Sequence, residues 1–206
     1  MAYKLAIYDW NGTLPNDVEV AYGGAVLVFK QFAPNIVPPS LEQYRGEDFP
    51  QFYYGHGIPK SVTLEDLYKI WVPHYEKHFN EIKLHDGVID LLSFCKTNGV
   101  PNAIVSAAPE IARKHLKQLG IERFFNNTIF NATDKENALV ETLDFFGAKA
   151  EDTFYVNDTR WGLVSAKNIG VCAIGFTGGF NDRAQISLAE PDYIVDSLRE
   201  IPALIK

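Results

Sequence analysis

From residue 84 onward, the chain alternates between apolar runs and amphipathic stretches. Helical periodicity is found in four stretches that each end at a glycine, a residue that closes helices readily: 86–99, 109–120, 134–147 and 160–170. Apolar runs typical of buried strands lie at 3–8, 100–107, 126–132, 152–158 and 171–177, and a last strand and helix are expected within 191–205. This alternation predicts βαβ units, and therefore an α/β fold with a Rossmann-like parallel sheet and helices on both faces.

The segment 15–83 has a different character, because it shows helical patterns and no strand pattern. Helices are expected at 18–33, at 41–58 with a break or restart at Pro50, and at 61–80 with a kink or break at Pro73. We therefore predict two domains: a core formed by 1–14 and 84–206, and a helical insertion formed by 15–83.

Polar residues follow several of the predicted strands, at the edge where parallel sheets build their sites. They are Asp9 with Asn11, Ser106, Asp134 with Lys135, and Asp158. Two carboxylates can hold Mg²⁺, while a hydroxyl and a lysine can hold the oxygens of a phosphate. A carboxylate next to a bound phosphorus can also attack it. The set therefore predicts a phosphate-handling site.

The same residues carry a family resemblance. The segments "DWNGTL" and "IVSA", followed by Lys135 and by "YVNDT", resemble the four ordered motifs of the haloacid dehalogenase-like superfamily of hydrolases. The resemblance covers nearly the whole chain, and the helical insertion is similar to the cap of the phosphoglycolate-phosphatase-like branch. It implies a Rossmann-like core carrying a helical cap at 15–83.

The resemblance also implies a role for each site residue. Asp9 would be the nucleophile and a magnesium ligand, and position 11 would supply the general acid/base and a backbone carbonyl ligand. Ser106 and Lys135 would bind the transferring phosphoryl group, and Asp158 would be a further acidic ligand of the metal. The expected activity is Mg²⁺-dependent hydrolysis of a small phosphorylated metabolite through a phospho-aspartate intermediate. The sequence does not indicate an oligomeric state.

Two positions depart from the family pattern. Asn11 stands where the family usually has an acid, and an amide neither takes nor gives a proton at neutral pH. General acid/base catalysis is typically worth about 10²–10⁴-fold in rate. Gly162 occupies the place of a second acid in the last motif, a loss that can weaken metal binding.

These departures keep two alternatives open. The opening "DWNGT" is close to the D-W-A-G-T of phosphonoacetaldehyde hydrolases, which cleave a carbon–phosphorus bond with a cap lysine. Candidate lysines in the insertion are Lys30, Lys60, Lys69 and Lys77. The other alternative is a protein that kept the fold to bind a phosphate or a partner without turnover.

Composition excludes several other classes. The net charge of -7 argues against nucleic acid as a partner, because binding to phosphate backbones needs clustered Lys and Arg. We find no membrane-spanning or signal-type stretch, so no membrane partner is expected and a cytoplasmic protein is the default. Cys95 and Cys172 stand singly in apolar settings and are expected to be small buried hydrophobes.

The helical insertion holds two further candidate features. The aromatic residues of 49–56 either line a pocket or pack the helices together, and packing is favoured. His74 and His78 lie four residues apart, on one helix face, but without an acidic third ligand in a recognisable motif. We therefore expect a solvated or packed pair rather than a metal site.

Overall fold

The computed structural model describes residues 3–47 and 49–205. The chain forms two compact units, which we call the core unit, Met1–Asn16 with Leu84–Lys206, and the helical unit, Asp17–Lys83. The core unit ends its first segment two residues beyond the position 14 expected from the sequence. It resumes at Leu84.

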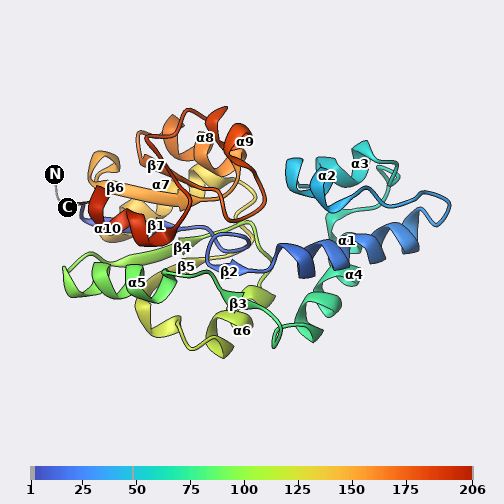
Figure 1. Ribbon diagram of the computed structural model, residues 1–206, viewed down its shortest axis with the longest axis horizontal. Helices are drawn as coiled ribbons and strands as arrows, with labels where there is room; N and C mark the ends of the chain where they lie inside the picture. Colours follow the sequence, from blue (N-terminus) through green and yellow to red (C-terminus); the bar gives the residue numbers. More distant parts are fainter. Residues whose placement is uncertain (1–2, 48, 206) are drawn as a thin grey trace. The chain divides into compact units, whose positions relative to one another are not determined.

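The core unit is built on a six-stranded sheet with the order β5-β4-β1-β6-β7-β8 (Figure 1). All neighbouring strands whose register is described run parallel. The strands are β1 (Leu5–Tyr8), β4 (Asn102–Val105), β5 (Phe125–Ile129), β6 (Thr153–Asn157), β7 (Cys172–Phe176) and β8 (Tyr193–Val195). The predicted α/β fold with a Rossmann-like parallel sheet is confirmed.

Side chains on β1 alternate between two apolar layers, as the two-residue period of a strand requires. Leu5 and Ile7 lie in one layer together with residues of α7 (Lys135–Phe146) and α8 (Arg160–Asn168). Ala6 and Tyr8 lie in the other layer. Helices on that side are α5 (Val88–Thr97), α6 (Ile111–Gln118) and α10 (Ile201–Leu204). The sheet is therefore covered on both faces, and β1 is buried throughout.

The remaining elements of the core unit are short. Helix α9 (Arg183–Ser187) packs its buried Ile186 in the layer of α7 and α8. Three turns of 3₁₀-helix precede β5, β6 and α10: η1 (Glu122–Phe124), η2 (Ala150–Asp152) and η3 (Leu198–Glu200). Helix α7 is closed by Gly147 in the left-handed conformation, as its glycine predicts.

The helical unit consists of α1 (Val18–Phe32), α2 (Leu41–Gly46), α3 (Gln51–Gly55) and α4 (Leu64–Lys77). Pro50 separates α2 from α3, whereas Pro73 lies inside a helix that continues past it, so the expected kink or break does not end α4. Thr63 and Asp66 form a reciprocal capping box at the start of α4. The hydroxyl of Tyr75 donates to the carboxylate of Asp17, which ties the start of α1 to α4.

Most of the clustered aromatic side chains pack within the helical unit. Phe52 and Tyr53 are buried, and both rings contact Phe29 of α1. Phe49, which is exposed, stacks on Tyr68. The packing interpretation of the 49–56 cluster therefore accounts for these rings.

Two strands lie where the sequence shows no strand pattern. They are β2 (Pro15–Asn16) and β3 (Lys83–Leu84), which pair with each other at the two ends of the insertion. The expectation that 15–83 contains no strand is wrong at its two margins, where Pro15, Asn16 and Lys83 belong to strands. A two-residue ladder depends on the meeting of two distant segments, and it is too short to show a period in the sequence.

Candidate active site

The three central strands end next to one another and bring three predicted residues to one edge of the sheet. Tyr8 at the end of β1 is in register with Ile104 of β4 and with Val156 of β6. Asp9 follows β1, Ser106 follows β4 and Asp158 follows β6. All three side chains are buried or nearly so, with residue exposures of 7% for Asp9, 2% for Ser106 and 0% for Asp158. The sheet thus gathers polar groups at a buried edge.

Lys135 joins this group from the first turn of α7. Its Nζ lies 2.7 Å from Oδ1 of Asp9 and 3.2 Å from the carbonyl oxygen of Val105. The side chain of Lys135 is only 2% exposed, and that of Asp9 10%. Asp134 caps the helix by accepting from the backbone amide of Asn137, which fixes where α7 begins. Helix α7 thereby places an ammonium group against the carboxylate at the end of β1.

Asp158 accepts a hydrogen bond on each of its carboxylate oxygens. Oδ1 receives the hydroxyl of Thr13 at 2.6 Å, and Oδ2 receives the backbone amide of Phe180 at 2.8 Å. Burial, followed by the neighbouring charge of Asp9, raises the pKa of Asp158 to about 7. Asp158 is thus a buried acid whose ionised form needs a nearby positive charge.

The backbone crowds Asp158 so closely that only glycine fits beside it. A Cβ on Gly12 would lie 2.2 Å from Oδ2 of Asp158, and a Cβ on Gly179 would lie 2.1 Å from the same atom. Gly12 also has a φ of +73°, in the left-handed region that glycine adopts easily. The turn after Asp9 and the loop after β7 therefore both close against Asp158.

Ser106 and Asn11 occupy less constrained settings. The Oγ of Ser106 accepts from the backbone amide of Ala108 at 3.2 Å, which orients the hydroxyl at the start of the loop after β4. Asn11 is half-buried in the turn after Asp9. The structure thus places Asp9, Asn11, Ser106, Lys135 and Asp158 around the carboxyl ends of three adjacent strands. Their assigned roles remain predictions.

Beneath Asp9 lies a hydrogen-bonded chain that the sequence did not reveal. The hydroxyl of Tyr155 donates to the Val105 carbonyl at 3.1 Å, the same oxygen that accepts from Lys135. Asn157 donates through Nδ2 to the Tyr155 hydroxyl at 2.7 Å, and its Oδ1 accepts from both the amide and the hydroxyl of Thr159. Burial and the charge of Asp9 raise the pKa of Tyr155 well above its ordinary value, so Tyr155 remains a neutral phenol.

The same series of hydrogen bonds explains why position 162 is a glycine. A Cβ there would lie 2.0 Å from Nδ2 of Asn157, so the Asn157 amide fills the space that a side chain at 162 would need. Reading Gly162 as a simple loss of a side chain is therefore incomplete. Asn157 places a neutral group in that space.

The donor set fits a hard divalent cation. Within residues 3–47 and 49–205, no group of three or more His, Cys, Asp and Glu side chains could hold a metal. The oxygen donors at the site are the carboxylates of Asp9 and Asp158, and the resemblance adds the backbone carbonyl of Asn11. Mg²⁺ is commonly held by one or two carboxylates with water and substrate phosphate completing its shell. The raised pKa of Asp158 points the same way, because a cation would offset the charge that burial disfavours.

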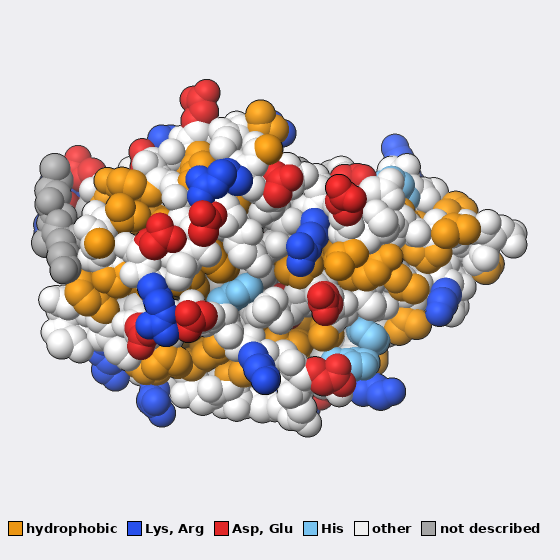
Figure 2. All heavy atoms as spheres, viewed as in Figure 1, with side chains coloured by type: hydrophobic (Ala, Val, Ile, Leu, Met, Phe, Trp, Pro, Cys, Tyr) orange, Lys and Arg blue, Asp and Glu red, His pale blue; other side chains and the backbone are white. Residues whose placement is uncertain are grey.

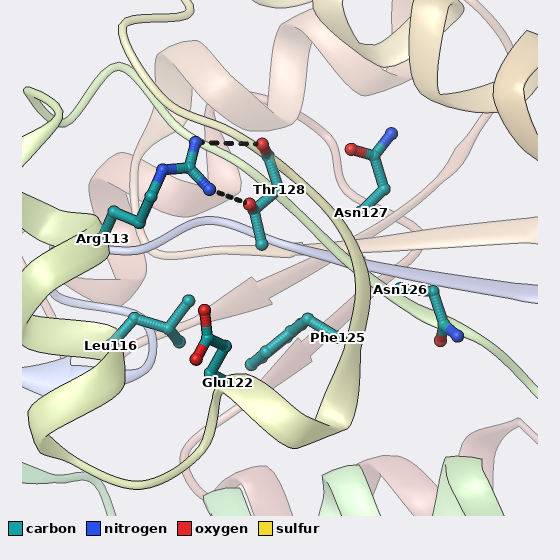
Figure 3. Close-up of a pocket in the computed structure, with 7 residues that line it drawn as sticks. All are labelled: Arg113, Leu116, Glu122, Phe125, Asn126, Asn127 and Thr128. Atoms are coloured by element: carbon teal, nitrogen blue, oxygen red, sulfur yellow. Dashed lines mark hydrogen bonds between the residues drawn. The ribbon is translucent and has the colours of Figure 1, made fainter.

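An open hollow of about 360 Å³ lies elsewhere in the core unit, between α6 and the edge strand β5 (Figure 3). Arg113 faces it, but its guanidinium is engaged by the Thr128 hydroxyl at 2.6 Å and by Glu110 at 3.0 Å. None of the predicted site residues lines this hollow.

On the face drawn in Figure 2, Lys and Arg side chains are interspersed with Asp and Glu. Among the helices of the described residues, none combines the length and the apolar character that a membrane crossing requires.

The two histidines near the end of α4 contact each other. His74 and His78 pack with ring centroids 4.2 Å apart, and the Nδ1 atom of His78 lies 2.8 Å from the carbonyl oxygen of His74.

Thr13, Phe180, Tyr155 and Asn157 were not among the predicted site residues. Thr13 lies inside the "DWNGTL" segment, so the sequence already indicated that it is close to the site. Phe180 contributes a backbone amide, which has no side-chain signal. In the sequence, only the glycines of the 177–181 loop pointed to this contact, because glycine in such a place marks a close approach of the backbone to another group.

Comparison with known proteins gives one consistent family. The family model described as haloacid dehalogenase-like hydrolase matches residues 6–176. A protein named phosphoglycolate phosphatase 1 from Pseudomonas aeruginosa is 28% identical over 151 residues, covering 70% of this chain and 55% of that protein. A protein named pyrophosphatase PpaX from Halalkalibacterium halodurans is 22% identical over 218 residues, covering 98% of this chain and 96% of that protein.

Solved structures agree on the fold. A haloacid dehalogenase-like family hydrolase from Streptococcus pneumoniae superimposes with a TM-score of 0.85 at 21% identity, covering 99% of both chains. At this identity, the likeness shows the fold alone.

Proposed function

The chain belongs to the haloacid dehalogenase-like hydrolases, and from that premise we propose that it hydrolyses a small phosphorylated metabolite through a phospho-Asp9 intermediate, with Mg²⁺ as cofactor. The single observation that carries the proposal is the contact of 2.7 Å between Lys135 and Asp9 at the buried edge where Ser106 and Asp158 also lie. A carboxylate, an ammonium group and a hydroxyl therefore lie at the same edge, which supports their proposed roles in phosphoryl transfer.

Each group has a part in the proposed reaction. Lys135 and the Ser106 hydroxyl bind the phosphoryl oxygens and hold the phosphorus against Asp9. A carboxylate oxygen of Asp9 attacks the phosphorus, the bond to the leaving oxygen breaks, and the electron pair departs with that oxygen. Water then attacks the phospho-Asp9, which releases inorganic phosphate and restores the carboxylate.

The metal would be held by the carboxylates of Asp9 and Asp158 and by a backbone carbonyl of the turn, which the resemblance assigns to Asn11. When bound, Mg²⁺ supplies positive charge that stabilises the phosphoryl oxygens in the transition state. Thr13 and the Phe180 amide orient Asp158 for this role, because each fixes one of its two oxygens.

The family relatives suggest which substrates to test first. Two relatives are named for phosphoglycolate and for pyrophosphate. We therefore propose a panel of phosphoglycolate, pyrophosphate, acetyl phosphate and p-nitrophenyl phosphate, measured with Mg²⁺ and with a chelator. Mg²⁺-dependent release of phosphate that disappears in Asp9→Asn supports the proposal. Absence of turnover across the panel and a wider set of esters would favour the binding-protein alternative.

The carbon–phosphorus alternative finds no support in the helical unit. A lysine that forms a Schiff base needs a lowered pKa, which burial or a neighbouring cation provides. Lys30, Lys60, Lys69 and Lys77 are all exposed. Hydrogen bonds to Glu65 and Asp66 raise the pKa of Lys69 instead. Borohydride trapping with phosphonoacetaldehyde tests this alternative directly, and a trapped adduct would revive it.

A further inference from the structure

Trp161 presents a large exposed ring beside the candidate site. It lies in the first turn of α8, directly after the site strand β6, and is 40% exposed. The other two tryptophans of the chain, Trp10 and Trp71, are 0% and 8% exposed. An exposed indole next to buried catalytic groups leaves apolar surface in water, which a planar ligand could cover.

The ring is in contact with the phosphate-binding cation. Nζ of Lys135 lies 5.5 Å from the centroid of the Trp161 ring, and 2.7 Å from Oδ1 of Asp9. The buried ring of Tyr155 lies against the same ammonium group, with a distance of 5.9 Å from Nζ to its centroid. A phosphoryl group bound to Lys135 would therefore lie close enough to the indole for a small leaving group to reach the ring.

The first turn of α8 is held firmly in place. Thr159, the N-cap, is bound by Oδ1 of Asn157 through both its amide at 2.7 Å and its hydroxyl at 2.8 Å. The amide of Arg160 donates to Oδ1 of Asn181 at 2.7 Å. Because both sides of the turn are fixed, the backbone that carries Trp161 is preorganised.

Asn11 gives an independent reason to expect a particular leaving group. An amide at that position cannot protonate a departing oxygen, so the site favours leaving groups that depart as stable anions. Phenolates meet this requirement, and they also carry a planar aromatic ring.

We propose that Trp161 is a specificity-determining residue that stacks on the aromatic ring of the leaving group, so that this site prefers phosphate esters of phenols. The inference rests on the proposed function, since it names the substrate class of the same site. An aromatic pair of this kind is worth roughly 2- to 10-fold in affinity.

The test compares the binding of two non-hydrolysable probes, phenylphosphonate and methylphosphonate, in the presence of excess Mg²⁺. Calorimetry on the wild-type protein should show tighter binding of phenylphosphonate. Trp161→Ala should reduce that preference by roughly 2- to 10-fold, because it should weaken the binding of phenylphosphonate more than that of methylphosphonate. Trp161→Phe should retain most of the preference, because it keeps a stacking ring.

Phe145→Ala is the matched control. Phe145 is 64% exposed on α7 of the same core unit, and its truncation should leave both affinities unchanged. An equal loss for both probes in Trp161→Ala would overturn the proposal, because it would mean that Trp161 only positions Lys135. An unchanged preference would overturn it as well.

A kinetic measurement separates this inference from the proposed function. Trp161→Ala should raise KM for p-nitrophenyl phosphate more than for acetyl phosphate, whose leaving group is also a stable anion but lacks a ring. If the probes bind with the expected preference and no ester is hydrolysed, the proposed function fails and the inference stands. If esters are hydrolysed and Trp161→Ala affects both substrates alike, the inference fails and the function stands.

Discussion

Nζ of Lys135 lies 2.7 Å from Oδ1 of Asp9, although the two residues are 126 positions apart in the sequence. Both side chains are nearly buried, and the ammonium group also donates to the Val105 carbonyl. A charge pair of this kind costs desolvation free energy and is weak evidence of a stabilising role. Under the proposed function, its position beside Asp9 keeps a cation ready where the phosphoryl group would bind.

Removal of Lys135 should therefore cost both activity and stability. Lys135→Met leaves the Asp9 carboxylate without its partner in a nearly buried site, and breaking such pairs typically costs about 3–5 kcal/mol. We expect urea denaturation of the metal-free protein to show a loss of this order, together with the loss of phosphatase turnover. The double variant Asp9→Asn/Lys135→Met should recover most of the stability and none of the activity.

Lys117→Met serves as the control for Lys135→Met. The Lys117 side chain is 58% exposed and lies 3.6 Å from Glu122, so its removal should change stability by less than about 0.5 kcal/mol. If Lys135→Met were as stable as the wild-type protein, the pair would not be buried in solution as described.

The sequence predicted the elements of the site better than their contacts. The alternating pattern located β1, β4 and β6, and the rule that parallel strands end at one edge placed Asp9, Ser106 and Asp158 together. Tyr155 and Asn157 were missed because they belong to β6, a strand that is buried on both faces. In such a strand, the sequence pattern does not show which way a hydroxyl or an amide points, because the three-dimensional packing sets that direction. The sequence did not show why position 162 is a glycine either, since the Asn157 amide that fills the space comes from another element.

Asp158 should make the stability of the metal-free protein depend on pH. Its pKa in the folded state is about 7, above the ordinary value of 3.8, so the folded protein binds more protons than the unfolded chain between these values. The free energy of unfolding should fall as the pH rises from about 4 to about 7, by at most about 1.4 kcal/mol per pH unit, and then level off. Asp158→Asn should lack this component.

The measurement is urea denaturation across this pH range in a chelator, taken as the difference between the wild-type protein and Asp158→Asn. The difference cancels the titration of groups that do not interact with Asp158. At pH 8, added Mg²⁺ should raise the Tm of the wild-type protein and leave that of Asp158→Asn unchanged. An equal rise in both proteins would remove Asp158 from the metal site.

The effect of Gly162→Ala on the free energy of unfolding should change sign when the Asn157 side chain is removed. Gly162→Ala alone would force the Asn157 amide from its place, where Tyr155 and Thr159 hold it, and we expect a cost of about 1–3 kcal/mol. In an Asn157→Gly background the space is empty. There Gly162→Ala should stabilise the protein by up to about 1 kcal/mol, because alanine favours the first turn of α8 more than glycine does. The same sign in both backgrounds, measured by urea denaturation, would show that the two positions do not share this space.

Asn11 should make turnover depend steeply on the leaving group. Without a proton donor at this position, esters with stable leaving anions should be hydrolysed far faster than alkyl esters. Asn11→Asp should speed the alkyl esters by a part of the roughly 10²–10⁴-fold that general acid catalysis supplies, and should help aryl esters less. The measurement is kcat/KM for one aryl and one alkyl phosphate with both proteins at saturating Mg²⁺.

A second carboxylate near Asp9 and Asp158 could also alter metal binding, so a Mg²⁺ titration of each protein is the control. With the metal bound normally, an equal effect on both esters would mean that Asn11 does not stand in for a missing acid, and that the leaving group is activated by other means.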